Sequence, residues 1–206
     1  MTAKCVIVTV LLLGNSQTAG QVGVLLEKYY RNHNVNVVRE AAVGKGVKYF
    51  LRATDPLSSD EESIVSHRQQ KNIRNMLSNG VDYVIFGSLG GNDAYKGCCH
   101  GKARGDMVKM YRRLFNQLCA YGATVVFNGS PPARTERHRK FDRRRAALDV
   151  IQDEAARGTC VIRNSTRDLH IPPDPDGYHY NMSARLYVDH LMTLPGMELP
   201  IIEATQ

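Results

Sequence analysis

The sequence lacks any apolar run long enough to cross a bilayer, which takes about 20 residues. Its most apolar stretch, residues 5–13, is far shorter and ends at Gly14. Lys4 and this stretch resemble the start of a signal peptide, but no small-x-small cleavage site follows cleanly. We interpret residues 5–13 as a first strand, and we expect a cytoplasmic protein without membrane contact.

Cysteine is also sparse, and internal repeats and low-complexity segments are absent. Five cysteines, an odd number, are scattered through the 206 residues. This does not resemble a disulfide framework, so we expect free thiols in a reducing compartment. Cys98, Cys99 and His100 are adjacent, but a structural zinc site needs a second such pair, and the sequence has none. We therefore expect no metal and no cofactor.

Short apolar segments alternate with amphipathic ones along the whole chain. Expected strands cover residues 5–13, 35–38, 81–86, 123–127 and 159–162, and expected helices cover residues 17–32, 47–52, 60–78, 106–121, 138–157 and 183–194. This alternation is typical of a parallel sheet covered by helices on both faces. Residues 95–105 are expected to be irregular. We expect one domain over residues 1–194, followed by a tail over residues 195–206.

Four turns that are rich in small and polar residues each follow an expected strand. They contain Ser16, Gly44, Asn92 and the pair Asp176 and His179. In a parallel sheet the carboxyl ends of the strands share one edge, where ligands usually bind. The four turns are therefore expected to lie together.

These residue types suit ester hydrolysis by a serine. Such a reaction needs a nucleophile, a base, an acid that orients the base, and donors for the oxyanion. Ser16 supplies a hydroxyl and His179 an imidazole, and Asp176 is close enough in sequence to orient that imidazole. Asn92 and the backbone N–H groups of Ser16 and Gly44 are candidate oxyanion donors. The alternative for Ser16 is that it only caps the following helix.

Three segments resemble the SGNH, or GDSL-type, hydrolase superfamily of esterases and lipases. Residues 14–18 read Gly-Asn-Ser-Gln-Thr, residues 90–93 read Gly-Gly-Asn-Asp, and residues 176–181 read Asp-Gly-Tyr-His-Tyr-Asn. The resemblance implies a flavodoxin-like three-layer α/β/α sandwich with sheet order 2-1-3-4-5. It also implies a triad and an oxyanion hole. The triad would be Ser16, Asp176 and His179, and the oxyanion hole would be Ser16, Gly44 and Asn92.

The chain departs from the family pattern at two places. The usual aspartate before the serine is Asn15 here, which removes a charge beside the nucleophile but keeps a hydrogen-bonding side chain. In the second family block, the usual asparagine is missing, and both Gly44 and Gly46 are candidates for the glycine donor.

A basic segment at residues 134–145 holds seven of the 27 Lys and Arg residues against two acids, in a chain of formal charge +7. Its cations are Arg134, Arg137, Arg139, Lys140, Arg143, Arg144 and Arg145. The simplest interpretation is a solvated helix face. A sharper hypothesis is that Arg143, Arg144 and Arg145 steer an anionic substrate, or that the segment docks an acidic partner. No aromatic platform accompanies it, so nucleic acid is a poor candidate.

The leading prediction is a serine esterase that removes a small, acetyl-type acyl group, with carbohydrate esters suggested by the superfamily. Two alternatives stay open. One is a non-catalytic relative that serves as a binding or structural part of a larger assembly. The other is a flavodoxin-like binder of a phosphate or nucleotide at the helix that follows Gly14, although no Gly-Lys-Ser/Thr P-loop is present.

Overall fold

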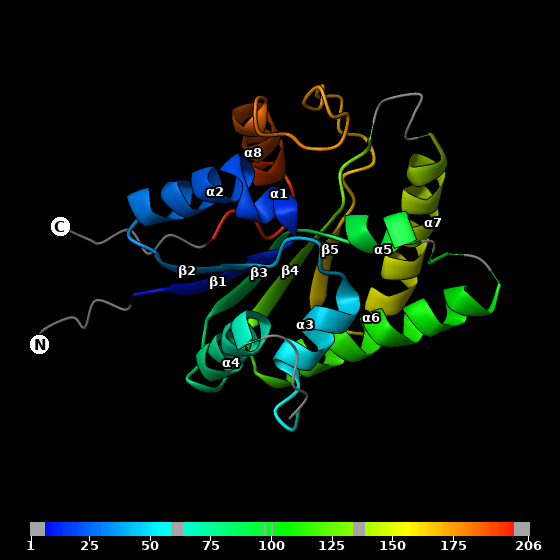
Figure 1. Ribbon diagram of the computed structural model, residues 1–206. Helices are drawn as coiled ribbons and strands as arrows, with labels where there is room; N and C mark the ends of the chain where they lie inside the picture. The colour runs from blue at the N-terminus through cyan, green and yellow to red at the C-terminus, as the bar shows by residue number, and fades with distance from the viewer. Residues whose placement is uncertain (1–6, 59–63, 97, 100, 134–138, 200–206) are drawn as a thin grey trace, which may run out of the picture.

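Five parallel strands form the centre of the computed structural model, which describes residues 7–58, 64–96, 98–99, 101–133 and 139–199 (Figure 1). The strand order is β2-β1-β3-β4-β5, which confirms the predicted order 2-1-3-4-5. The strands are β1 (Thr9–Gly14), β2 (Asn36–Ala41), β3 (Tyr83–Leu89), β4 (Thr124–Gly129) and β5 (Val161–Asn164).

Helices cover both faces of the sheet, as predicted for a three-layer sandwich. They are α1 (Ser16–Ala19), α2 (Gln21–Asn32), α3 (Val47–Thr54), α4 (Ile64–Ser78), α5 (Gly91–Lys96), α6 (Lys102–Ala120), α7 (Arg139–Ala156) and α8 (Ala184–Met192). The helices α2 and α8 pack on one face, and α3, α4, α6 and α7 pack on the other (Figure 1). Within the described residues, no helix combines the length and the hydropathy that crossing a membrane would require.

Strand β1 explains why the apolar run in the sequence is continuous. Its four central residues, from Val10 to Leu13, are all fully buried. Leu11 and Leu13 pack against the layer of α3, α4 and α6, while Val10 and Leu12 pack against the layer of α2 and α8. A strand with helices on both faces has no polar side, so its residues need not alternate.

Helix boundaries differ from the prediction at two places. The single helix expected over residues 17–32 is interrupted at Gly20, where a Cβ atom would stand 2.3 Å from Oδ1 of Asn181. The region expected to be irregular, residues 95–105, contains the end of α5 and the start of α6. The break at Gly20 involves a residue that is distant in the sequence, which local patterns do not report.

The cysteines correct the expectation of free thiols. Cys98 is bonded to its neighbour Cys99, and Cys119 at the end of α6 is bonded to Cys160 beside β5. Cys5 lies outside the described residues. Disulfides are typical of oxidising compartments, so these pairs weigh against the reducing compartment that the cysteine count suggested.

The first residues of the expected tail belong to the core. Met197 is fully buried, and its carbonyl oxygen accepts a hydrogen bond of 2.9 Å from the hydroxyl of Tyr30 in α2. Its sulfur lies 3.2 Å from the amide nitrogen of Asn128 in β4. The chain after α8 therefore closes the layer formed by α2 and α8.

Candidate active site

The turns that follow β1, β2 and β3 meet at one edge of the sheet. Gly14 at the end of β1 pairs with Ala41 of β2 on one side and with Ser88 of β3 on the other. Beyond the strands, the N–H of Ala42 donates to the carbonyl oxygen of Gly14 at 2.8 Å, and the N–H of Asn15 donates to that of Ser88 at 3.1 Å. The backbone immediately before Ser16 is therefore fixed by both neighbouring strands.

Asn15, rather than Ser16, caps the short helix α1. The side chain of Asn15 is buried, and its Oδ1 atom accepts a hydrogen bond of 3.0 Å from the N–H of Gln17. Ser16 is the first residue of the helix. Its hydroxyl is not needed for capping, which sets aside the alternative that Ser16 serves only as a cap.

The hydroxyl of Ser16 faces the imidazole of His179. The distance from Oγ of Ser16 to Nε2 of His179 is 3.1 Å, and the distance from Nδ1 of His179 to Oδ2 of Asp176 is 2.5 Å. With its proton on Nδ1, toward the carboxylate, the imidazole presents a lone pair on Nε2 to the serine hydroxyl. The three side chains have the hydrogen-bonding order of a nucleophile, a base and an orienting acid.

Backbone hydrogen bonds help to keep Asp176 ionised. Its Oδ1 atom accepts the N–H of Tyr178 at 2.8 Å and the N–H of His179 at 2.9 Å. Burial raises the pKa of Asp176, but the hydrogen bonds from His179 and Tyr178 outweigh this effect and lower the pKa to about 2. The carboxylate is therefore charged at neutral pH and can stabilise an imidazolium.

Two side-chain hydrogen bonds fix the loop that contains His179 to α1 and α2. The side-chain amide of Gln17 donates to the carbonyl oxygen of Tyr178 at 2.7 Å. On the other side of His179, Oδ1 of Asn181 accepts the N–H of Gln21, the first residue of α2, at 3.1 Å. Neither Gln17 nor Asn181 was predicted to be a functional residue, although both lie within the motifs at residues 14–18 and 176–181.

Tyr178, the residue before His179, packs against α7. Its ring lies 5.0 Å from that of Phe141 in the first turns of α7, measured between centroids. A Cβ atom on Gly91 would stand 2.9 Å from the Tyr178 hydroxyl oxygen, so the glycine makes room for this ring. Burial raises the pKa of Tyr178 to about 12.

Asn92 lies in α5, immediately beyond β3. Its Nδ2 atom donates to the carbonyl oxygen of Lys45 at 2.9 Å. An amide nitrogen has two hydrogens, so this bond uses one of them and leaves the second for another acceptor. The assignment of Asn92 as an oxyanion donor stays a prediction.

The two candidate glycines after β2 are required for different structural reasons. Gly44 has a φ of +72° in a turn closed by the N–H of Lys45 and the carbonyl oxygen of Ala42, at 3.2 Å. This left-handed conformation favours glycine. Gly46 precedes α3 with a φ of −115°, and it lies against the carboxylate of Asp93. Gly44 stays the predicted second oxyanion donor.

One of the three arginines predicted to steer substrate is buried. Arg145 is 5% exposed, its Nη1 atom donates to the carbonyl oxygen of Ser130 at 3.2 Å, and its Nε atom lies 3.3 Å from Oδ1 of Asp142. Its guanidinium fixes the loop after β4 to α7. The expectation that Arg145 faces solvent and attracts substrate is therefore wrong.

The other two arginines are more accessible. Arg143 is exposed, and Arg144 is partly exposed and donates to the carbonyl oxygen of Tyr95 at 3.2 Å. Residues 134–138 of the basic segment lie outside the described part of the chain, so their contribution to such a surface is untested. The steering hypothesis now concerns Arg143 and Arg144.

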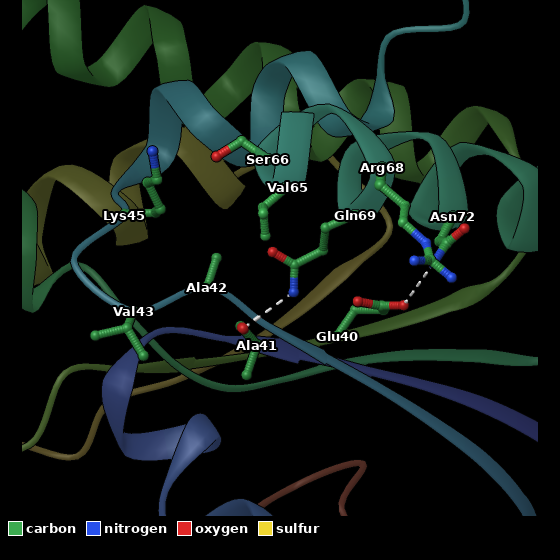
Figure 2. Close-up of a pocket in the computed structure, with 10 residues that line it drawn as sticks. All are labelled: Glu40, Ala41, Ala42, Val43, Lys45, Val65, Ser66, Arg68, Gln69 and Asn72. Atoms are coloured by element: carbon green, nitrogen blue, oxygen red, sulfur yellow. Dashed lines mark hydrogen bonds between the residues drawn. The ribbon is translucent and has the colours of Figure 1, made fainter. Parts of the chain in front are cut away.

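A pocket of about 410 Å³ adjoins this edge of the sheet (Figure 2). It lies between the end of β2, the turn that contains Gly44, and α4. Inside it, the Gln69 amide donates to the carbonyl oxygen of Ala41 at 3.0 Å. Its lining residues are Glu40, Ala41, Ala42, Val43, Lys45, Val65, Ser66, Arg68, Gln69 and Asn72. None of the triad residues is among them, so this pocket is separate from the Ser16–His179–Asp176 contacts.

Among the described residues, no three His, Cys, Asp or Glu side chains lie close enough together to bind a metal ion. His100 lies outside these residues.

No protein-family model and no curated protein matches this chain. Solved structures do match. Esterase EstA from Pseudoalteromonas sp. is 17% identical, with 90% of this chain and 95% of that chain covered and a TM-score of 0.58. A catalytic mutant of Axe2, an acetylxylan esterase from Geobacillus stearothermophilus, is 13% identical, with 94% and 97% covered and a TM-score of 0.63. LAE5, an alpha/beta hydrolase from the metagenome of Lake Arreo, Spain, is 14% identical, with 90% and 94% covered and a TM-score of 0.62.

At these identities the likeness shows the fold alone. The chain shares the fold of these hydrolases, and the match covers almost the whole length of this chain and of each of the three structures. The fold that the SGNH-type resemblance implied, a parallel sheet of order 2-1-3-4-5 between two layers of helices, is thus confirmed.

Proposed function

We propose that the protein is a serine esterase of the SGNH type, with Ser16 as nucleophile, His179 as base and Asp176 as the acid that orients the base. The observation that carries the proposal is the continuous pair of contacts from Ser16 through His179 to Asp176, at 3.1 and 2.5 Å. Similarity in fold to esterases supports it.

In the proposed reaction, Nε2 of His179 takes the proton of Ser16 as Oγ attacks the ester carbonyl. The tetrahedral oxyanion is stabilised by the N–H groups of Ser16 and Gly44 and by the Asn92 amide. Ser16 opens a helix, and its N–H has no acceptor within that helix. His179 then protonates the alcohol as it leaves, and a water molecule, deprotonated by His179, releases the acyl group from Ser16.

We propose a small acyl group, of the acetyl type, on a carbohydrate or a similar alcohol. The acyl and alcohol preferences rest on similarity in fold to an acetylxylan esterase. Sugar esters present hydroxyl groups, and the pocket beside the Gly44 turn offers polar side chains that could bind them, such as those of Glu40 and Asn72.

The test combines turnover with covalent labelling. Wild-type protein should hydrolyse p-nitrophenyl acetate faster than the butyrate, and a fluorophosphonate probe should modify Ser16, located by peptide mass spectrometry. Ser16→Ala should lose both hydrolysis and labelling. Replacement of Ser78, which is exposed at the end of α4, should change neither. A folded wild-type protein that is neither active nor labelled would overturn the proposal in favour of a non-catalytic relative.

A further inference from the structure

Two adjacent side chains of α5 bind the segment after β2 from both sides of Gly46. The Nδ2 atom of Asn92 donates to the carbonyl oxygen of Lys45 at 2.9 Å. The carboxylate of Asp93 accepts the N–H of Val47 at 3.0 Å through Oδ2 and at 3.3 Å through Oδ1. The segment therefore makes two side-chain hydrogen bonds to α5, one residue before and one residue after Gly46.

Gly46 is a glycine because Asp93 lies against it. Its φ of −115° is open to any residue, so backbone strain does not explain the choice. A Cβ atom at this position would stand 2.1 Å from Oδ1 of Asp93 and 2.7 Å from its Cγ. Any side chain at Gly46 would displace the carboxylate, so the two residues depend on each other.

Asp93 is itself fixed from the opposite side. The hydroxyl of Tyr111, a fully buried residue of α6, donates to Oδ2 of Asp93 at 2.9 Å. Burial raises the pKa of Asp93, and the hydrogen bonds from Tyr111 and Val47 oppose the rise. The carboxylate also stands at the start of α3, where the helix dipole favours negative charge.

These contacts join the two segments that are proposed to donate to the oxyanion. Gly44 lies two residues before Gly46, in the turn after β2, and Asn92 lies one residue before Asp93 in α5. An oxyanion hole works only when its donors keep a fixed spacing before the substrate arrives. The spacing between these two donors depends on how firmly the turn is attached to α5.

We propose that Asp93 is a positioning residue, which holds the turn after β2 against α5 so that the Gly44 N–H and the Asn92 amide keep the separation that an oxyanion requires. This inference rests on the proposed esterase function. The competing interpretation is that Asp93 only caps α3 and contributes to stability alone.

Kinetics of variants separates the two. Asp93→Ala should lower kcat for p-nitrophenyl acetate by about 10- to 100-fold, the size expected for displacement of a donor, with KM within about threefold. Asp93→Asn keeps an acceptor for Val47 and should restore most of kcat. The matched control is Asp82→Ala, which removes a carboxylate bonded to the N–H of Thr9 at 2.7 Å, at the opposite edge of the sheet. It should leave kcat unchanged.

A double-mutant cycle tests the mutual dependence of Asp93 and Gly46. Gly46→Ala alone should lower kcat about as much as Asp93→Ala, because its Cβ displaces the carboxylate. In the Asp93→Ala background, adding Gly46→Ala should lower kcat further by less than about threefold. Additive losses, or a kcat of Asp93→Ala equal to that of the wild type, would overturn the inference.

Hydrogen exchange gives a result that does not depend on catalysis. Amides of residues 42–47 should exchange faster in Asp93→Ala than in wild type, while the peptide around Thr9 should not change. Unchanged exchange in this segment would also overturn the inference. If wild-type protein proves inactive and unlabelled at Ser16, the esterase proposal fails, and exchange still reports separately whether Asp93 fixes the turn.

Discussion

The side-chain amide of Gln17 donates a hydrogen bond of 2.7 Å to the carbonyl oxygen of Tyr178. This bond joins the residue after the proposed nucleophile to the residue before the proposed base. It connects positions that are 161 residues apart in the sequence. The alignment of Ser16 with His179 therefore depends on a contact that takes no part in the chemistry.

Gln17→Ala should consequently lower kcat by about 10-fold, because a small displacement of reacting groups slows the chemical step more than it weakens substrate binding. KM for p-nitrophenyl acetate should stay within about threefold. Steady-state kinetics checks this, with Gln117→Ala as the control. That side chain accepts a hydrogen bond from Thr54 at 3.0 Å, away from the candidate site. Equal kcat values for Gln17→Ala and wild type would contradict a positioning role.

The pKa of Asp176 sets how stability should depend on pH. The folded protein lowers this pKa from 3.8 to about 2, so the ionised carboxylate stabilises the fold above the usual pKa. This contribution is lost as the pH falls through the folded pKa. Asp176→Asn should unfold at lower denaturant than wild type at pH 7, and the difference should shrink as the pH approaches 2. A difference that is independent of pH would contradict the assignment.

The same substitution should also reduce kcat severely, by a factor of up to about 10⁴, since the imidazole loses the anion that orients it. Because Asp176 is ionised throughout, the wild-type kcat/KM profile should show no protonation of this residue above pH 4. Stopped assays from pH 4 to 9 measure both effects.

Arg145 should matter for stability rather than for substrate. Arg145→Leu removes the bonds to Ser130 and Asp142 and should lower the free energy of unfolding by about 1–3 kcal/mol. Denaturant titration measures this. If stability is unchanged, the buried guanidinium does not support the loop after β4.

Arg143 and Arg144 allow the opposite test. If they steer an anionic ester, replacing both with glutamine should flatten the dependence of kcat/KM on ionic strength, because exposed charges act through screened long-range fields. Neutral p-nitrophenyl acetate serves as the control, since its turnover should not respond. An unchanged salt dependence for an anionic ester would exclude steering by this pair.

The disulfide between Cys119 and Cys160 closes a loop between residues 41 positions apart. Replacing both cysteines with serine should lower the free energy of unfolding by about 2–4 kcal/mol, because the unfolded chain gains freedom. Thermal unfolding with and without reductant measures the loss, and thiol counting by mass spectrometry checks the pairing. A wild-type protein with free thiols at both positions would restore the original expectation.

Much of the architecture was predictable because it depends on local patterns. The apolar run of β1 and the small-residue turns after the strands located the edge where Ser16, Asn92 and His179 now lie. Parallel strands then place distant turns together without any further information.

Other features could not be read from the sequence. A glycine is compatible with a positive φ, as at Gly44, or with a close contact, as at Gly46, and only coordinates distinguish the two. Arg145 lies in a run of cations that resembles a solvated face, yet the loop after β4 buries it. The break at Gly20 depends on Asn181, which is distant in sequence.

The most direct test of Ser16 as the nucleophile is the site of acylation during turnover. Wild-type protein mixed with p-nitrophenyl acetate, quenched rapidly in acid and digested, should show one acetyl group on the peptide that contains Ser16. His179→Ala should show almost none at the same time point. Turnover that proceeds with the acetyl group on another residue, or with Ser16 unmodified, would contradict the proposed role of Ser16.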